Sequence, residues 1–138
     1  MTPSNIPAQL RRLVIERANG RCEYCLVRSS DVLLPHEPDH ILATKHGGRT
    51  TADNLALACI HCNRRKGSDL ASIDSVTGQV TPLFNPRTQD WPEHFSLSGA
   101  HIAPLSPEGR VTVALLQLNH PDRLRVREAM VKAGRYPQ

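Results

Sequence analysis

The chain has 138 residues, enough for one domain, and we expect residues 1–138 to form a single one. Its hydrophobic content is 39% and its aromatic content is 4%, so the core must be aliphatic and modest, and a bound metal would add stability. No apolar run approaches the roughly 18 residues of a membrane helix, and no signal-peptide pattern opens the chain. We therefore expect a cytoplasmic protein without a membrane partner. The formal charge of +4 suits a polyanionic partner, although the placement of Lys and Arg matters more than the sum.

The segment 5–19 predicts an N-terminal helix. Asn5 is a suitable cap, Pro7 suits the first turn and Gly20 ends the helix. The apolar residues at helical spacing are Leu10, Leu13 and Val14, and the basic residues are Arg11, Arg12 and Arg17. The basic side is either a solvated surface or a contact with a DNA backbone.

All the cysteines of the chain fall in two Cys-x-x-Cys pairs, Cys22 with Cys25 and Cys59 with Cys62. In a reducing compartment this pattern favours metal over disulfides. Four thiolates in two pairs are the ligand set of a closed, tetrahedral Zn²⁺ site with a structural role, and redox-active or free thiols are the alternative. His61 lies inside the second pair, where we expect a spacer and not a fifth ligand.

The residues between and just after the two pairs predict a strand, a loop, a second strand and a helix. A strand is expected over 32–41, where Pro35 excludes a helix, and a second over 54–58. Glycines at 47–48 let the polar loop between them bend. A helix begins near His61, which completes a ββα unit.

Three polar residues in this unit predict a reaction centre. Asp39 and His40 lie at the end of the first expected strand, and Asn63 follows the last cysteine. A carboxylate and an amide oxygen are hard ligands suited to Mg²⁺ or Mn²⁺, and an imidazole beside them can take a proton from water. In an ideal strand, however, Asp39 and His40 point to opposite faces. Both can act on one phosphate only if the strand end is twisted or bulged, or if the metal lies at its edge.

Residues 22–67 resemble the HNH endonuclease family, in the variant whose last motif position is Asn. The motifs that carry the resemblance are D-H-I at 39–41, G-G at 47–48, D-N-L at 53–55 and C-x-x-C-N-x-x-K-G at 59–67. The resemblance implies a ββα-metal fold in which the catalytic motif positions are His40, Asn54 and Asn63. It implies that His40 is the general base and that Asp39 and Asn63 hold the catalytic ion. It also implies that Asn54 fixes the loop between the strands through backbone hydrogen bonds.

Basic and imidazole side chains around this centre are candidates for contact with phosphates. We take as candidate nucleic-acid-binding residues Arg64, Arg65, Lys66, Arg49 and His36, with His46 as a further loop position. His36 would share a strand face with His40. For each of them, a plain solvent-exposed side chain is the alternative.

The segment 70–138 predicts an extension without a chemical motif of its own. The expected elements are a hairpin over 70–85, a loop over 85–92, a hairpin over 95–105, and helices over 106–118 and 121–133. Trp91 is expected to attach this extension to the core. The face expected to dock the last helix consists of Leu124, Val126, Met130 and Val131.

Together these observations predict an α+β fold with a ββα-metal core, a four-cysteine zinc site, an N-terminal helix and a C-terminal extension of hairpins and helices. The expected function is that of a metal-dependent DNA endonuclease with DNA as its partner and no organic cofactor. The alternative is a non-catalytic zinc module that binds nucleic acid or protein. A complete set of acid, base and amide around one position favours the enzyme.

Overall fold

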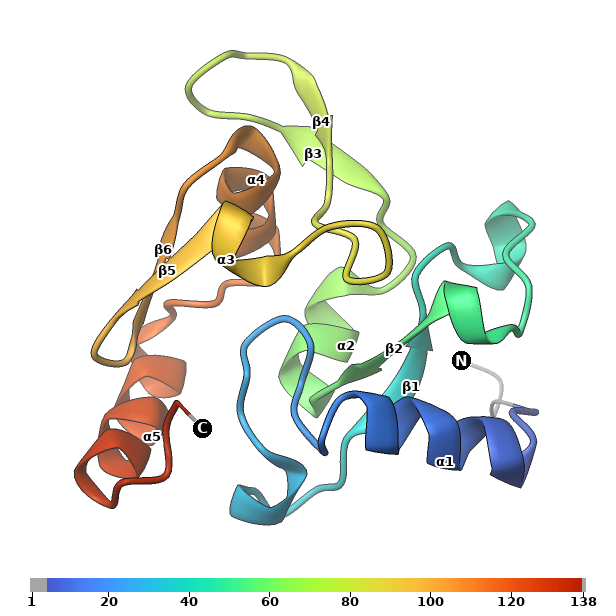
Figure 1. Ribbon diagram of the computed structural model, residues 1–138. Helices are drawn as coiled ribbons and strands as arrows, with labels where there is room; N and C mark the ends of the chain where they lie inside the picture. Colours follow the sequence, from blue (N-terminus) through green and yellow to red (C-terminus); the bar gives the residue numbers. More distant parts are fainter. Residues whose placement is uncertain (1–4, 138) are drawn as a thin grey trace.

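A computed structural model describes residues 5–137, which form a mixed arrangement of short helices and three two-stranded antiparallel sheets (Figure 1). The α-helices are α1 (Ala8–Arg17), α2 (Ile60–Lys66), α3 (Trp91–His94), α4 (Pro107–Leu115) and α5 (Pro121–Lys132). The strands are β1 (Glu37–His40), β2 (Leu55–Ala58), β3 (Ala71–Ile73), β4 (Val80–Pro82), β5 (Phe95–Ser98) and β6 (His101–Pro104). Single 3-10 turns are η1 (Ser29–Asp31), η2 (Thr44–His46) and η3 (Ala52–Asn54). None of the helices in this described part is long and apolar enough to cross a membrane.

The two faces of β2 are buried against different parts of the protein. Leu55 and Leu57 pack with Ile6 and Val14, so this face lies against α1. Ala56 and Ala58 face the other way and belong to the main core, which also contains the four cysteines. Burial of β2 on both sides explains why its sequence is a continuous apolar run. The expected α+β architecture with a ββα unit is confirmed.

The first strand is much shorter than expected. A strand over 32–41 was predicted, but β1 begins only at Glu37, and the chain before it runs through η1 and irregular backbone. Pro35 cannot donate a ladder hydrogen bond, and Pro38 is tolerated because β1 pairs on one side only, with β2. Helix α1 is also shorter than predicted: its N-cap is Pro7, which makes no side-chain capping bond, so Asn5 is not the cap.

The C-terminal extension is joined to the first cysteine pair through several contacts. Trp91 donates from its indole Nε1 to the carbonyl oxygen of Tyr24 at 2.9 Å, and its ring lies 5.0 Å from that of Phe95. Tyr136 donates from its hydroxyl to the carbonyl oxygen of Cys25 at 2.8 Å. Apolar residues of the extension and the cysteines therefore share one hydrophobic cluster.

The β3–β4 hairpin is fastened to α4 by a buried carboxylate. Asp74 accepts two hydrogen bonds from the guanidinium of Arg110, at 2.7 and 2.9 Å. The Arg110 bonds lower the pKa of Asp74 below its usual range. A paired charge of this kind is tolerated in the interior because its hydrogen bonds are satisfied.

The docking face of α5 is not the one expected. Val126 and Val131 are exposed, and the buried residues of the helix are Arg123, Arg127 and Met130. Arg127 donates from Nε to the carbonyl oxygen of residue 100 at 2.8 Å. The prediction holds for Met130 but was wrong for Val126 and Val131, because an arginine can be buried when its guanidinium finds carbonyl or sulfur acceptors, which apolar spacing cannot reveal.

Candidate functional site

The four cysteine side chains meet in one buried cluster. Their sulfur atoms all lie within 4.8 Å of one another, and those of Cys25 and Cys59 are 3.7 Å apart. A tetrahedral Zn²⁺ with Zn–S bonds of about 2.3 Å holds its sulfurs about 3.8 Å apart. In each pair the backbone N–H of the second cysteine points to the sulfur of the first, at 3.5 Å for Cys22 and 3.4 Å for Cys59. The cluster therefore fits the predicted zinc site and joins the first pair to the start of α2.

The protonation of these thiols is set by burial and by their contacts with one another. Burial raises the pKa of Cys22 and Cys62, whereas hydrogen bonds among the sulfurs lower the pKa of Cys25 and Cys59. Thiols that still hold protons must release them when a metal binds, so we expect metal binding to strengthen as the pH rises.

Arg123 brings a positive charge from α5 to the cysteine cluster. Its guanidinium donates to the Cys62 sulfur at 3.0 Å and lies 3.7 Å from the Cys59 sulfur. A second nitrogen donates to the carbonyl oxygen of Leu116 at 2.7 Å. Burial alone lowers the pKa of Arg123, but the thiolate charge of Cys62 and its neighbours raises it above the ordinary value. Four thiolates around Zn²⁺ carry a net charge of −2, which this guanidinium partly compensates.

His40 ends β1 and lies beside the loop that joins β1 to β2. Its ring nitrogen Nε2 is 2.9 Å from the hydroxyl oxygen of Thr50. The loop bends at Gly47, where φ is +90°, and at Gly48, where a Cβ would lie 1.7 Å from the carbonyl oxygen of Leu42. The two glycines are therefore needed for a positive φ and for a close backbone approach.

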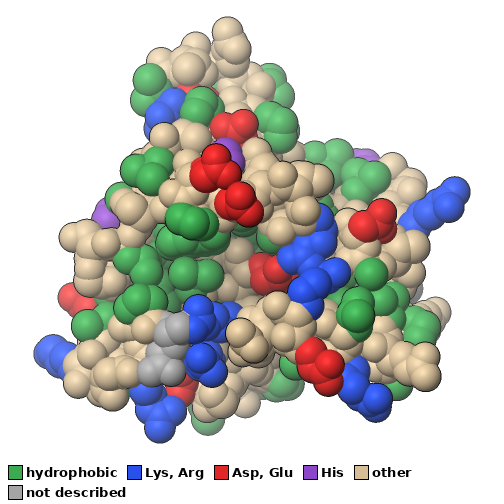
Figure 2. Space-filling model, viewed as in Figure 1, with side chains coloured by type: hydrophobic (Ala, Val, Ile, Leu, Met, Phe, Trp, Pro, Cys, Tyr) green, Lys and Arg blue, Asp and Glu red, His purple; other side chains and the backbone are tan. Residues whose placement is uncertain are grey.

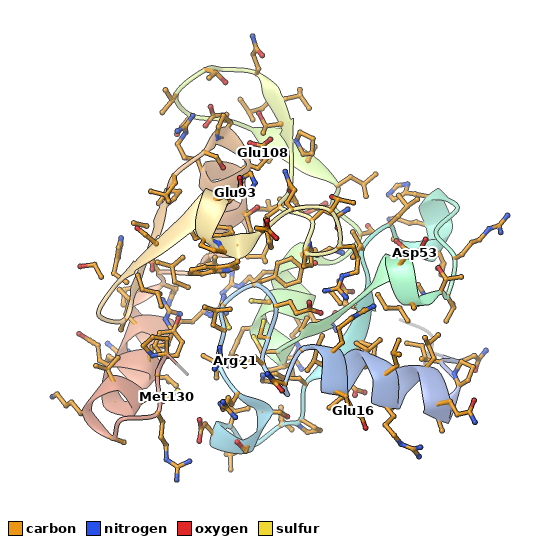
Figure 3. The ribbon with its side chains drawn as sticks, viewed as in Figure 1. Glu16, Arg21, Asp53, Glu93, Glu108 and Met130 are labelled. Atoms are coloured by element: carbon orange, nitrogen blue, oxygen red, sulfur yellow. The ribbon has the colours of Figure 1, made fainter. Side chains whose placement is uncertain are left out.

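Asn54 makes three backbone hydrogen bonds across the same loop. Its Oδ1 accepts from the N–H of Leu42 at 2.9 Å, and its Nδ2 donates to the carbonyl oxygens of Leu42 at 3.0 Å and Arg49 at 2.8 Å. Figure 3 shows Asp53 on η3, just before β2, where it accepts a hydrogen bond from the Thr51 hydroxyl. These bonds fix the ends of the loop that presents Thr50 to His40.

Asp39 lies on the α2 side of the sheet, in contact with Lys66. The carboxylate is 11% exposed and its Oδ2 is 2.9 Å from the ammonium of Lys66, whose side chain is 3% exposed. The same ammonium donates to the carbonyl oxygen of His40 at 2.9 Å. Burial raises the pKa of Asp39, and the charge of Lys66 opposes that increase. The expectation that Lys66 is an exposed phosphate ligand is therefore wrong, because its ammonium is buried on β1.

Asn63 shares a side of α2 with Lys66, because residues three apart in a helix are neighbours. It is half-buried and borders a surface hollow together with Glu37 at the start of β1. The pairing of β1 with β2 is regular up to His40, with Asp39 opposite Ala56 and His40 opposite Leu55. Asp39 and His40 therefore leave the strand on opposite faces. The register excludes a bulge, so a twisted strand end or an ion at the strand edge would be needed to bring Asp39 and His40 to one phosphate.

The other predicted contact residues divide into exposed and buried ones. Arg64 and Arg65 on α2 and Arg49 on the loop are exposed, as is His46. His36 is 4% exposed, and its Nε2 lies 2.7 Å from the carbonyl oxygen of Val27. Its burial opposes the predicted contact with nucleic acid: the strand starts after His36, and its ring contacts the backbone that follows the first cysteine pair.

A network that the sequence did not predict joins three segments beside β2. Glu23 accepts from the N–H of Leu57 at 2.8 Å and pairs with Arg87 of the extension. Arg17, expected on a solvated or DNA-binding side of α1, donates to the carbonyl oxygens of Leu55 at 2.7 Å and Ala52 at 2.8 Å. The segment that carries Arg87 also borders the hollow beside Lys66, through residues 85, 88 and 89. The extension thus forms one wall next to the end of β1.

Comparison with known proteins identifies the central segment. A family model described as HNH endonuclease matches residues 22–69. The chain is also similar to the Septu protein PtuB of Bacillus thuringiensis, with 26% identity over 117 residues. That alignment covers 83% of this chain, and the chain spans 43% of the length of that relative. No solved structure matches the chain.

The cysteine cluster gives a prediction on metal content. Purified protein should contain about one tightly held zinc ion per chain, the number that a single four-ligand site allows. Cys59→Ser should lower both the zinc content and the melting temperature, because one ligand is lost. Elemental analysis and thermal unfolding check this. A zinc-free protein whose four thiols all react freely in the native state would contradict it.

The contact of Arg123 with the cluster gives a second prediction. Arg123→Met removes the charge and the sulfur hydrogen bonds but keeps an apolar side chain of similar length. Zinc affinity should fall about 10- to 100-fold, the usual effect of losing a partner of a metal ligand. Competition with a chromophoric chelator measures it. Arg125→Met is the matched control, because Arg125 lies on the same helix but is 70% exposed and pairs with Asp122. If Arg123→Met and Arg125→Met bind zinc equally tightly, the contact of Arg123 with the cysteines does not stabilise the bound ion.

Proposed function

Since residues 22–69 belong to the HNH endonuclease family, we propose that the protein is a metal-dependent endonuclease that hydrolyses phosphodiester bonds of DNA. The observation that carries the proposal is that Asp39 and His40 occupy adjacent positions at the end of β1, inside the segment that matches the family. Asp39 faces α2 through its contact with Lys66, Asn63 lies one turn before Lys66 on that helix, and His40 is the last residue of the strand. A carboxylate, an amide and an imidazole at one edge suit the hydrolysis of a phosphodiester.

The residues around Asp39 fit a divalent ion. Its Oδ2 is paired with the ammonium of Lys66, whereas its Oδ1 accepts no hydrogen bond from the described residues. Asn63, one turn before Lys66 on α2, would add a neutral oxygen. Hard oxygen ligands of this kind, few in number, suit Mg²⁺ or Mn²⁺ bound with several waters. We infer that Asp39 and Asn63 hold such an ion, which would neutralise the developing charge of the phosphate and the leaving oxygen.

His40 is the proposed general base. In the tautomer whose Nε2–H donates to the Thr50 hydroxyl, Nδ1 is left as a proton acceptor. Nδ1 would take a proton from the attacking water. The loop that carries Thr50 is held by Asn54, so Asn54 acts through the orientation of the imidazole and is a positioning residue.

Contacts with DNA are assigned to exposed basic residues on α2 and on the loop between β1 and β2. Arg64 and Arg65 follow Asn63 on α2, and Arg49 lies on the loop that Asn54 holds. Figure 2 shows Lys and Arg side chains in separate groups on the face in view, one over the segment between α5 and α1, where Figure 3 labels Arg21, and one between α1 and the hairpins. No continuous basic stripe is seen on that face, so the assignment rests on the place of these residues on the elements that carry Asn63 and Asn54 and not on net charge.

A non-catalytic zinc module that binds nucleic acid or protein remains the competing function. It would need the cysteine cluster but not an acid, an amide and a fixed imidazole at one edge. Incubation with supercoiled plasmid, with and without Mg²⁺ or Mn²⁺, separates the two functions. Open-circular or linear product that depends on the ion supports the nuclease.

Substitutions at the strand end test the proposed roles. His40→Ala should lower the cleavage rate ~10²–10⁴-fold, the usual contribution of a general base, while ion and DNA binding stay nearly intact. Asp39→Ala should weaken ion binding, so part of its lost activity should return at high Mg²⁺ or Mn²⁺. Plasmid cleavage across a metal titration, together with calorimetric metal binding, distinguishes the two patterns.

Zinc content serves as the control for both variants, since neither substitution touches a cysteine. It should equal that of the parent protein. Cleavage by His40→Ala at the parent rate would disprove the catalytic assignment.

Binding of DNA should be driven by phosphate contacts and weaken steeply with salt. Arg64→Gln and Arg65→Gln should each reduce the slope of log affinity against log salt by about 1, the value for one lost phosphate contact. Fluorescence anisotropy with a catalytically inactive His40→Ala background measures the slope without cleavage. Lys132→Gln, exposed at the end of α5, is the matched control and should leave it unchanged. An affinity insensitive to salt would contradict the assignment.

A further inference from the structure

Lys66 is the one residue of the basic run at 64–66 that is buried. Its side chain is 3% exposed, whereas Arg64 and Arg65 are exposed. A helix turns about 100° per residue, so neighbours in sequence point to different sides of α2. Lys66 therefore points to β1, on the side that also carries Asn63. A residue so placed cannot grip a phosphate on the surface.

The ammonium of Lys66 holds two parts of the strand end at once. It lies 2.9 Å from Asp39 Oδ2 and donates to the carbonyl oxygen of His40 at 2.9 Å. It thus fixes both the carboxylate proposed to bind the ion and the backbone of the proposed base. A buried ion pair adds little net stability compared with apolar residues, so stability alone is a weak reason for this arrangement.

We propose that Lys66 is a positioning residue that makes Asp39 a one-oxygen ligand and thereby favours Mg²⁺ or Mn²⁺ over Ca²⁺. The inference rests on the proposed function, in which Asp39 binds the catalytic ion. With Oδ2 committed to the ammonium, only Oδ1 is free for an ion. Mg²⁺ takes single oxygens in octahedral geometry, whereas Ca²⁺ accepts six to eight ligands and often both oxygens of a carboxylate. The ion pair therefore works against the bidentate binding that Ca²⁺ uses.

The ratio of the two ion affinities is the quantity to measure. Removing a positive charge near the site raises the affinity for every divalent ion, and that effect cancels in a ratio. Release of Oδ2 does not cancel, because it adds a ligand for Ca²⁺ and little for Mg²⁺. In Lys66→Met the affinity for Ca²⁺ relative to Mg²⁺ should rise about tenfold, which corresponds to about 1.4 kcal/mol.

The experiment is calorimetric titration of zinc-loaded protein with Mg²⁺ and with Ca²⁺. The variants are the parent, Lys66→Met, Lys66→Arg, which keeps the charge and the donor, and Arg65→Met, which removes an exposed charge one residue away. Lys66→Arg and Arg65→Met should keep the parent ratio. Zinc content and melting temperature show whether each variant folds. If Lys66→Met does not fold, Lys66→Gln, which keeps a donor for the His40 carbonyl, must show the same shift.

Two results would overturn the inference. An unchanged ion ratio in folded Lys66→Met means that the ion pair does not set the binding mode of Asp39. A DNA affinity that falls in Lys66→Met with a smaller salt slope, as expected for Arg64→Gln, means that Lys66 contacts phosphate. Failure of the proposed function looks different: the parent itself would bind neither ion at this site and would cleave no plasmid.

Discussion

The arrangement of the core depends on bringing four sulfur atoms together from two segments of the chain. The pairs Cys22–Cys25 and Cys59–Cys62 enclose β1, the loop and β2, and their sulfurs lie within 4.8 Å of one another. This fixes the start of α2 against the sheet. Asn63 follows the last cysteine directly, so its distance from β1 is set by the same constraint. A short helix and a pair of four-residue strands, too small to be stable alone, are held in register by this cluster.

Burial of several thiolates is unfavourable unless a positive charge lies close to them, and the C-terminal extension supplies that charge. Arg123 supplies a guanidinium to Cys62, and Tyr136 and Trp91 bind carbonyl oxygens of the first cysteine loop. These contacts come from residues beyond the match to the HNH family model, which ends at residue 69. The extension is therefore part of the environment of the metal site, and a cut after α2 would leave the sulfurs without their nearest buried cation.

Short-range patterns were predictable from the sequence, whereas the burial of single polar residues was not. The cysteine pairs and the ββα order follow from residues close in the chain, whereas the backbone bonds of Asn54 were expected from the resemblance to the HNH family. His36 was placed on the face of His40 because the expected strand covered both residues. The observed strand β1 begins only at Glu37, so the alternation of faces does not extend to His36. The contact of Arg123 with the cysteine cluster was not predicted, because nothing near Arg123 in the sequence indicates a sulfur partner 61 residues away. Such contacts are set by tertiary packing, on which local spacing gives no information.

The end of β1 is held from both sides, and this bears on how catalysis would work there. Lys66 fixes the carbonyl of His40 and the carboxylate of Asp39 from the α2 side, while Asn54 and Thr50 fix the loop and the imidazole from the other. Asp39 and His40 leave opposite faces of a regular strand, so each side chain is positioned by its own contacts. Preorganised groups lower the barrier only when they are already placed for the transition state. In the proposed nuclease, a strand end that is held from both sides would meet that requirement without a bulge.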